Sequence, residues 1–166
     1  MRTLYLLRHG KSSWDDPGLP DRERPLAPRG VRDAKRIATH LLRLEIAPGL
    51  VLCSPALRAR QTLEPIEATV PEAPVEVDER LYGASSETLL ERVRAVPDEV
   101  PSVLLIGHNP GLQDLALLLA ARGDELERLE AKFPTAALAT LSLERWSSLG
   151  AGDAELGAYV VPKQLR

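Results

Sequence analysis

Thr3-Leu4-Tyr5-Leu6-Leu7 runs directly into Arg8-His9-Gly10, so a short apolar stretch ends at once in a basic residue, an imidazole and a glycine. Two further apolar runs, Leu50 to Cys53 and Val103 to Ile106, are followed by Ser54 and by Gly107-His108. Short apolar runs with few polar interruptions are typical of strands in a sheet that is covered on both faces. The three runs therefore predict three buried strands of one sheet.

Amphipathic stretches separate these predicted strands. Val31, Ala34, Ala38 and Leu41 recur at helical spacing, which predicts a helix with one apolar face between the first two strands. After the second strand, Ser54-Pro55 has the residue types of an N-cap followed by a first-turn proline. We therefore expect a second helix to begin there.

The second predicted helix carries Arg58 and Gln61, and Pro65 is expected to end or kink it because proline lacks an N–H donor. The stretch from Glu64 to Glu79 is rich in proline and acids, which predicts mostly loop with one short strand near Val75 to Val77.

The rest of the chain continues the alternation of helices and strands. Helices are expected from Ser85 through Val96 and from Asn109 to about Ala121, and strands over Ala136 to Leu143 and Leu156 to Val161. Such alternation is typical of an α/β fold. We expect residues 1–166 to form a single three-layer α/β/α domain around a mixed, mostly parallel central sheet.

Composition excludes several classes of function. The net charge of −3 provides no general basic field for nucleic acid. The longest apolar run, Leu115 to Ala121, is far shorter than a bilayer, so no membrane association is expected. A single cysteine, Cys53, excludes an internal disulfide framework and a cysteine-based zinc cluster. The sequence also lacks a His-x-x-x-His pair of the kind that binds zinc. We expect a cytoplasmic protein without metal or cofactor.

Three separated segments place basic or imidazole side chains directly after predicted strands. They contain Arg8-His9-Gly10, Ser54 to Arg58, and Gly107-His108-Asn109-Pro110. Ligand sites of open α/β sheets lie outside the carboxyl ends of the strands, so these segments are expected to converge there. Two arginines and two histidines in one crevice suit a dianion, and the starts of two helices would add positive dipole ends.

The residue types suggest how such a site would work. Arginine offers a planar fork of donors that fits phosphate oxygens. Neutral imidazole is a nucleophile, and nearby arginines disfavour the imidazolium form, so His9 is expected to be neutral in the empty site. The same arginines disfavour the imidazolium form of His108, and a bound dianion would then favour that protonated form. Gly10 is expected to let the backbone approach the substrate closely.

The motifs together resemble the histidine phosphatase superfamily, whose fold is phosphoglycerate mutase-like. The resemblance rests on the Arg-His-Gly opening, on Ser-Pro-x-x-Arg-Ala-x-Gln-Thr over residues 54–62, and on Gly-His-Asn-Pro over residues 107–110. The short chain is similar to the SixA-type phosphohistidine phosphatases. The resemblance implies transient phosphorylation of His9 without a metal. It implies a phosphate pocket made by Arg8, Arg58 and His108, and we add Gly10, Ser12 and Asn109 as further phosphate-binding candidates.

Two carboxylates, Glu79 and Asp15, have roles that the resemblance does not settle. Glu79, in Asp-Glu-Arg-Leu-Tyr-Gly, resembles the catalytic acid of mutase-like relatives, but it is equally consistent with a solvated loop carboxylate. An alkoxide leaving group would need such an acid far more than a departing imidazole would. Asp15 stands where those relatives have asparagine and would repel phosphate, so we expect it to turn away or to pair with an arginine.

Several residues have structural interpretations beside functional ones. His40 is expected to lie at the surface or boundary of its helix, and Gln61 and Thr62 to pack behind the site. Trp14 and Trp146 are expected to be packing aromatics, with Trp14 able to line the pocket entrance. The arginines at positions 22, 24, 29 and 32 form either a solvated face or a surface that steers an acidic or phosphorylated partner.

The sequence therefore favours a phosphatase that removes phosphate from phosphohistidine on a protein such as a phosphotransfer domain. Two alternatives stay open: a small-molecule phosphomonoesterase of broad specificity, and a non-catalytic module that binds phosphoproteins. Retention of the nucleophile argues against the second, since binding needs the arginines but not His9.

Overall fold

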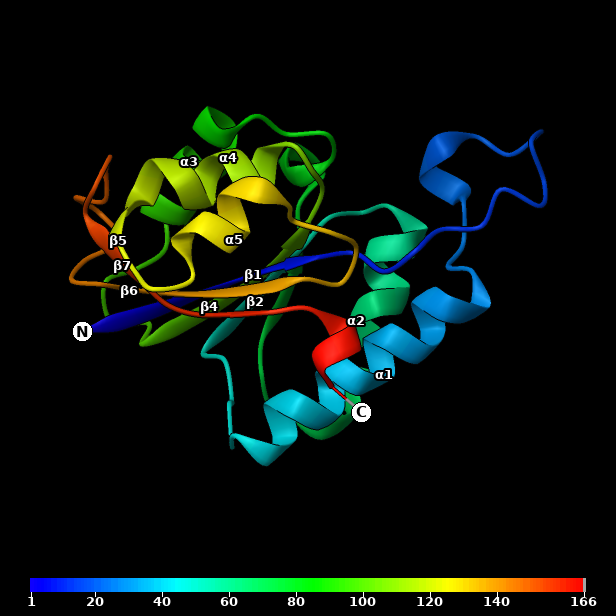
Figure 1. Cartoon of the computed structure of the whole chain (residues 1–166), viewed down its shortest axis with the longest axis horizontal. Helices are drawn as coiled ribbons and strands as arrows, with labels where there is room; N and C mark the ends of the chain where they lie inside the picture. Colours follow the sequence, from blue (N-terminus) through cyan, green and yellow to red (C-terminus); the bar gives the residue numbers. More distant parts are fainter. Residues whose placement is uncertain (166) are drawn as a thin grey trace.

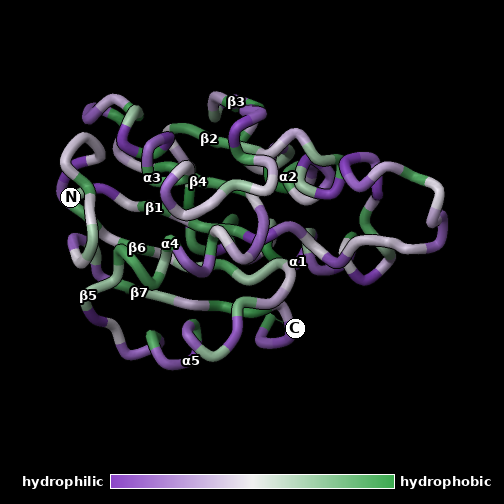
Figure 2. The backbone as a smooth tube through the Cα atoms, turned by 90° about the horizontal axis from the view of Figure 1, so that it is seen from above, coloured by the Kyte–Doolittle hydropathy of each residue, from purple (hydrophilic) through white to green (hydrophobic). Residues whose placement is uncertain are grey.

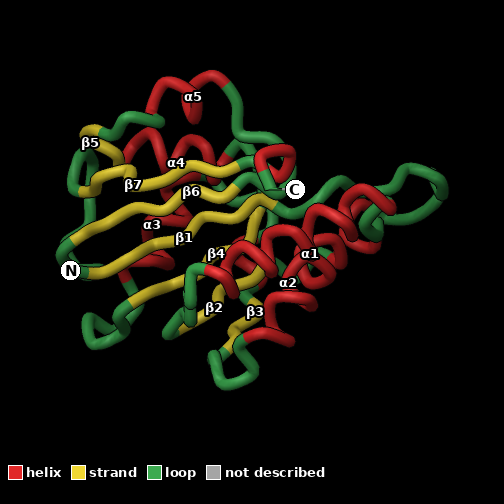
Figure 3. Tube along the Cα trace, turned by 60° about the horizontal axis from the view of Figure 1, so that its bottom comes forward, coloured by secondary structure: helices red, strands yellow, loops and turns green. Residues whose placement is uncertain are grey.

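The computed structural model describes residues 1–165. It contains a seven-stranded sheet with the strand order β3-β2-β4-β1-β6-β7-β5 (Figures 1 and 3). The strands are β1 (Arg2–Arg8), β2 (Leu50–Cys53), β3 (Val75–Val77), β4 (Ser102–Gly107), β5 (Ala120–Arg122), β6 (Leu138–Leu143) and β7 (Ala154–Val160).

Strand β1 lies at the centre of the sheet. It pairs in parallel with β4, where Leu6 is opposite Leu105, and antiparallel with β6, where Leu6 is opposite Ala139. The pairs β2–β3, β2–β4 and β5–β7 are also parallel, and β6–β7 is antiparallel. Only β6 therefore runs against the others within the described residues, which confirms the predicted mixed, mostly parallel sheet.

Helices cover both faces of the sheet (Figure 1). On one face lie α1 (Pro28–Arg43) and α2 (Leu57–Thr69), and on the other lie α3 (Ser86–Arg94), α4 (Gly111–Leu119) and α5 (Leu126–Ala131). Successive side chains of a strand point to opposite faces. Leu6 accordingly packs with the α3–α5 layer and Leu7 with the α1–α2 layer. The predicted three-layer α/β/α architecture is confirmed.

Apolar residues are concentrated in the central strands, as the hydropathy colouring shows (Figure 2). All four residues of β2 and five of the six residues of β4 are buried. The segment between β1 and α1 instead projects from the body of the molecule as an arm (Figures 1 and 2). This arm carries the short 3₁₀ helix η1 (Asp21–Glu23). None of the described helices is long and apolar enough to cross a membrane.

Helix α2 differs from its predicted start, and Pro65 does not end it. It begins at Leu57, and its N-cap is Ala56 without a side-chain cap hydrogen bond, so the predicted start at Ser54-Pro55 is wrong. It also continues through Pro65 to Thr69. Ile66, directly after the proline, is fully buried against the sheet, so packing compensates for the missing N–H donor.

The segment after β4 is also more divided than predicted. Helix α4 stops at Leu119, and residues 120–122 form β5, which pairs with β7. Helix α5 follows where the sequence pattern predicted no element. Strand β3 matches its predicted bounds, whereas the two late strands begin two residues away from their predicted starts, at Leu138 and Ala154. Element ends depend on tertiary pairing more than on local pattern.

Candidate active site

A cavity of about 450 Å³ lies at the carboxyl ends of the central strands. Arg8 is the last residue of β1, His108 directly follows β4, and Arg58 lies in the first turn of α2 after β2. The structure thus brings the three predicted segments together. The cavity is lined by Arg8, His9, Lys11, Ser12, Trp14, Asp21, Arg24, Arg58, Tyr82, Gly83, His108, Asn109 and Thr135.

The His9 ring is held so that one nitrogen is protonated and the other is free. His9 is 7% exposed, and its Nδ1 lies 2.7 Å from the carbonyl oxygen of Gly10. A carbonyl can only accept, so Nδ1 carries the proton and Nε2 keeps its lone pair. Arg58 Nε donates to His9 Nε2 across 3.4 Å, which is a weak contact at the long end of hydrogen-bond range. The nucleophilic nitrogen is therefore oriented but not strongly engaged.

Both histidines of the cavity are held neutral. Burial, followed by the charges of His108, Arg58 and Arg8, lowers the pKa of His9 to about 3 despite its hydrogen bond to Gly10. Burial and Arg58 lower the pKa of His108 to about 4. The direction agrees with the sequence prediction, but desolvation rather than the field of the arginines is the largest cause.

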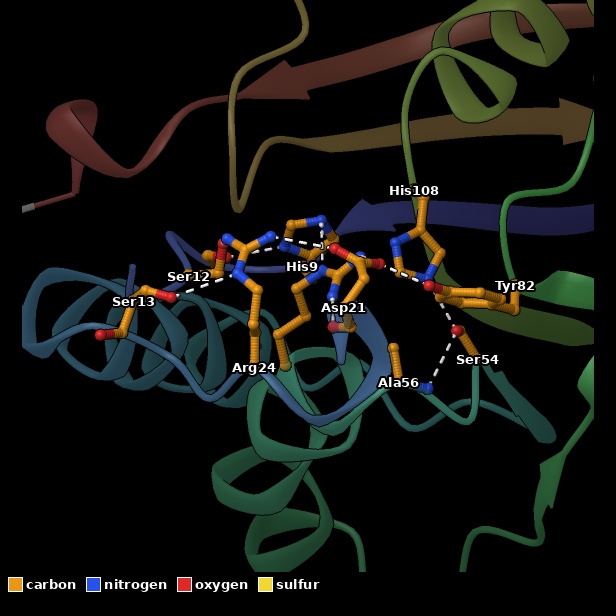
Figure 4. A network of polar contacts seen from close by, with 11 residues as sticks. His9, Ser12, Ser13, Asp21, Arg24, Ser54, Ala56, Tyr82 and His108 are labelled. Atoms are coloured by element: carbon orange, nitrogen blue, oxygen red, sulfur yellow. Dashed lines mark hydrogen bonds and ion pairs between the residues drawn. The ribbon is translucent and has the colours of Figure 1, made fainter. Parts of the chain in front are cut away.

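His108 is positioned by a residue that the sequence assigned to another role. Its Nε2 lies 2.7 Å from Ser54 Oγ, and the two imidazole rings of His9 and His108 are 5.0 Å apart between centroids (Figure 4). Ser54 Oγ also accepts a hydrogen bond from the N–H of Ala56 at 3.3 Å. Because that hydroxyl faces His108, Ser54 orients the imidazole instead of capping α2.

Asp21 is a site residue that the sequence reasoning missed. Its carboxylate accepts from Arg58 Nη2 at 3.0 Å, from Arg24 Nη1 at 3.0 Å and from the Tyr82 hydroxyl (Figure 4). The hydrogen bond from Tyr82, together with those from Arg58 and Arg24, lowers the pKa of Asp21 to about 2. An ionised carboxylate thus occupies donors that would otherwise be available to a phosphate.

Arg8 and Asn109 are tied to the same backbone carbonyl. Arg8 Nη1 and Asn109 Nδ2 each donate to the carbonyl of Phe133 at 3.0 Å. The Nε–H of Arg8 is buried and has no acceptor among the described residues. Such an unpaired buried donor is costly unless something accepts from it. Arg8 also lines the cavity, where its guanidinium contributes positive charge for an anion.

Gly10 has a different role from the one predicted, and it is not among the residues lining the cavity. Its N–H donates to Thr62 Oγ1 at 3.0 Å, so it is not free for a phosphate oxygen. A Cβ added to Gly10 would lie 2.9 Å from the carbonyl oxygen of Gly30 in α1. The glycine is therefore needed for close packing of the two backbones.

Glu79 is not brought to the histidines. Its side chain is 72% exposed, does not line the cavity and pairs with Arg22 at 2.7 Å. Asp15 is also exposed and outside the cavity lining, in line with its expected turn away from phosphate. Both carboxylates therefore lie apart from the cluster that Asp21 joins.

The arm supplies the rim of the cavity. Ser12 lines the cavity and accepts a hydrogen bond from Arg24 Nη2. The guanidinium of Arg24 lies 3.3 Å from the ring centroid of Trp14, whose side chain is 66% exposed. Trp14 therefore lines the entrance, whereas Trp146 is fully buried as a packing aromatic.

The missed residues Asp21, Tyr82, Arg24 and Ser54 share one property. All four lie in loops, turns or 3₁₀ helices, where no periodicity indicates which side chain faces inward. For Asp21 the only signal in the sequence is its place beside the arginines at positions 22 and 24.

The chain belongs to the histidine phosphatase superfamily, because the family model of branch 1 of that superfamily matches residues 4–103. It is accordingly a phosphatase, with a site built at the strand ends described above.

The chain is also similar to individual proteins and solved structures. An uncharacterized protein of Mycobacterium tuberculosis is 42% identical over 163 residues, which is 95% of this chain and all of the relative. SixA from Nakamurella multipartitia has a similar structure, with a TM-score of 0.85 and 31% identity over 97% of this chain and 96% of that one. The protein histidine phosphatase SixA complexed with tungstate gives a TM-score of 0.82 and 27% identity over 99% of both chains.

Proposed function

We propose that this phosphatase removes phosphate from phosphohistidine on a protein, such as a phosphotransfer domain, by way of a phosphohistidine intermediate on its own His9. The observation that carries the choice of substrate is the state of the single carboxylate that lines the described cavity. Asp21 has a pKa of about 2 and accepts from two arginines and a tyrosine, so it has no proton to give.

In the first step, Nε2 of His9 attacks phosphorus, and a bond from phosphorus to His9 forms as the bond to the substrate nitrogen breaks. Neutrality of His9 supports this role, since imidazolium has no free electron pair. The hydrogen bond from Nδ1 to the Gly10 carbonyl supports the growing positive charge on the ring. In the second step, water attacks phosphorus, and His9 leaves with release of inorganic phosphate.

The positive charge of the pocket supplies the stabilisation that phosphoryl transfer needs. Arg8, Arg58 and His108 surround the position of the attacking nitrogen. A bound dianion would raise the pKa of His108 from about 4 and so favour a protonated ring that donates to a phosphate oxygen. Metal independence is part of the proposal because the arginines can provide this charge.

The leaving group decides between substrates. An oxygen ester must expel an alkoxide, which calls for a general acid, whereas a departing imidazole nitrogen is basic and is easily protonated by water. Asp21 is ionised and Glu79 is ion-paired outside the cavity, which favours the nitrogen leaving group. The related SixA structure is that of a protein histidine phosphatase, and its complex with tungstate suits a phosphate-binding pocket of this kind.

We further propose that residues 1–166 act as one histidine phosphatase domain in the cytoplasm. The continuous sheet, to which both ends of the sequence contribute strands, supports the single unit. The buried, unpaired thiol of Cys53 is compatible with a reducing compartment.

Trapping the intermediate tests the nucleophile. The protein mixed with ³²P-labelled phosphohistidine peptide and quenched in alkali should carry a label that is stable to alkali and labile to acid. His9→Asn should abolish the label and lower kcat/KM by at least about a thousandfold. His40→Asn, a matched change on α1, should behave like wild type. A label that survives in His9→Asn would refute this role for His9.

Comparing leaving groups tests the substrate class. Rates on a phosphohistidine peptide, a phosphoserine peptide and an aryl monophosphate should fall in an order that follows the ease of leaving, with phosphoserine slowest. Glu79→Gln should leave the phosphohistidine rate unchanged. Faster hydrolysis of phosphoserine than of phosphohistidine, together with its loss in Glu79→Gln, would point instead to an oxygen esterase.

A further inference from the structure

A second cavity of about 550 Å³ lies between α1, α5 and the C-terminal 3₁₀ turn η3 (Pro162–Gln164). Figure 1 shows this turn beside α1, and the two elements are in contact. Six of its lining side chains are cationic: Arg29, Arg32, Arg36, Arg128, Lys132 and Lys163. The lining contains one carboxylate, Asp33, although the chain as a whole has a net charge of −3. We call this space the basic cavity.

The positive charge of the basic cavity is only partly neutralised by the protein. Asp33 is shared between Arg36 at 3.2 Å and Arg29 at 3.9 Å, and Arg128 pairs with Glu125. Within residues 1–165, no ion pair joins a carboxylate to the other three cations, Arg32, Lys132 and Lys163. Like charges lining one concavity repel each other and focus a field that attracts anions.

The start of α1 adds to this field. Its N-cap, Ala27, makes no side-chain cap hydrogen bond, and its first turn contains no acid but does contain Arg29. Acidic residues normally stabilise this end of a helix, and cations are disfavoured there. An arrangement that breaks such a local rule is expected where a ligand compensates for it. Because Arg29 of this first turn also lines the basic cavity, the start of α1 adds to the attraction for an anion there.

The basic cavity adjoins the active site through a shared wall. Thr135 lines both cavities. On the side of the active site, the carbonyl of Phe133 accepts from Arg8, and the N–H of Ala136 donates to the carbonyls of Arg8 and His9. An anion in the basic cavity would therefore contact the segment that holds the Arg8-His9 backbone.

We propose that the basic cavity is a second anion-binding site that takes a small, multiply charged phosphate ligand. Its volume lies in the range of small-molecule sites, and its floor includes the apolar residues Ala131, Pro134 and Val161. The phosphate chemistry has two possible sources: a second phosphate of a substrate that also enters the active site, or a separate effector. Binding at this site does not depend on the reaction proposed for His9.

Binding is tested by titrating inorganic pyrophosphate into the protein with the active site saturated with tungstate, followed by amide NMR. Amide signals of α1 and of Lys163 should shift. The double variant Arg32→Glu, Lys163→Glu should raise the Kd at least tenfold, and Arg145→Glu, an exposed arginine outside both cavities, should leave it unchanged. Arg32→Ala, Lys163→Ala provides a milder version should the reversal disturb folding.

An unchanged Kd in both double variants, or shifts confined to the active-site amides, would overturn the proposal. Kinetics then distinguish the two sources of phosphate. If the site anchors the substrate, the double variant loses kcat/KM at least tenfold for an aryl bisphosphate but not for the aryl monophosphate. If the ligand is an effector, pyrophosphate changes turnover of the monophosphate in wild type and not in the double variant.

Discussion

Asp21 shows how a single carboxylate sets the state of the empty site. It occupies donors of Arg58, Arg24 and Tyr82 at the edge of the cavity. Its charge competes with an incoming dianion for Arg58, but it also holds that guanidinium near His9. The repulsion between Asp21 and the dianion lowers the affinity for the anion, whereas the positioning of Arg58 affects kcat.

Asp21→Asn should therefore strengthen binding of tungstate, since it removes a negative charge from the lining of the cavity while keeping the size of the side chain. A contribution of about 1 kcal/mol corresponds to roughly fivefold tighter inhibition at low salt, and the gain should shrink as salt is added. Inhibition constants at two ionic strengths measure this. The control is Asp15→Asn, outside the cavity, and weaker inhibition of Asp21→Asn would contradict the competition.

Ser54 is the second residue whose role comes from a single contact. Ser54→Ala removes the partner of His108 Nε2, and we expect kcat to fall about tenfold with little change in KM, because an imidazole that is free to turn stabilises the transferred oxygens less well. Nitrogen-15 NMR of the His108 ring should show an altered tautomer population.

Ser85→Ala is the matched control for Ser54→Ala. Ser85 caps α3 by accepting from the N–H of Thr88, so its loss should cost about 1 kcal/mol of stability without affecting the His108 signals. If the two variants give the same kinetics and the same ring spectra, Ser54 has no orienting role.

Among the elements, the turn after β1 and helix α1 are held in close contact by two glycines. A Cβ on Gly30 of α1 would lie 2.2 Å from the carbonyl oxygen of Lys11, and one on Gly10 would lie 2.9 Å from the carbonyl oxygen of Gly30. Both clashes are with backbone and cannot be relieved by a side-chain rotation. The position of α1 thus determines where the turn after His9 lies.

Gly30→Ala should consequently force the turn and the helix apart. We expect a loss of about 2 kcal/mol in the free energy of unfolding, within the range for overpacked sites, and a fall in kcat. Urea unfolding monitored by circular dichroism measures the free energy of unfolding, and steady-state kinetics measure kcat. Gly18→Ala, whose Cβ would meet only a carboxylate oxygen of Asp16 at 3.3 Å, should change stability by less than about 0.5 kcal/mol.

For the molecule as a whole, the two buried histidines couple stability to pH. In the unfolded chain both histidines take up a proton as the pH falls through 6.5. In the folded chain the pKa is about 4 for His108 and about 3 for His9, so these protons bind only at lower pH. Their contribution is fully present above pH 6.5 and is lost as the pH falls toward 4. Each histidine adds a slope of about 1.4 kcal/mol per pH unit in that window.

Urea unfolding at pH 7, 6 and 5 should thus show falling stability in wild type and a flatter dependence in His9→Asn and in His108→Asn. His40 is partly buried near Arg43, which also lowers its pKa, so His40→Asn should flatten the dependence less. Identical slopes in wild type and in both active-site variants would show that these histidines are not held neutral.

Much of the fold and part of the site could be predicted from local pattern. The strands around Leu6, Leu52 and Leu105 were evident because fully buried strands leave unbroken apolar runs. The first residues of α2 and of β7 are not evident from the sequence, because packing and strand pairing move such boundaries by a few residues. Glu79 was a candidate on motif alone, and its ion pair with Arg22 depends on where the arm lies.

The sequence pattern alone predicts that Arg8, His9, Arg58 and His108 lie close together. Each follows a strand or opens the next helix, and the carboxyl ends of parallel strands lie at one edge of a sheet. Two features are visible only in the folded molecule: Asp21, Tyr82 and Ser54 complete the site, and six cations from separate segments line a second cavity. Asp21, Tyr82 and Ser54 lie in loops or 3₁₀ turns without periodicity. The six cations come from α1, α5, Lys132 and η3, and local periodicity does not encode the long-range packing that brings these segments together.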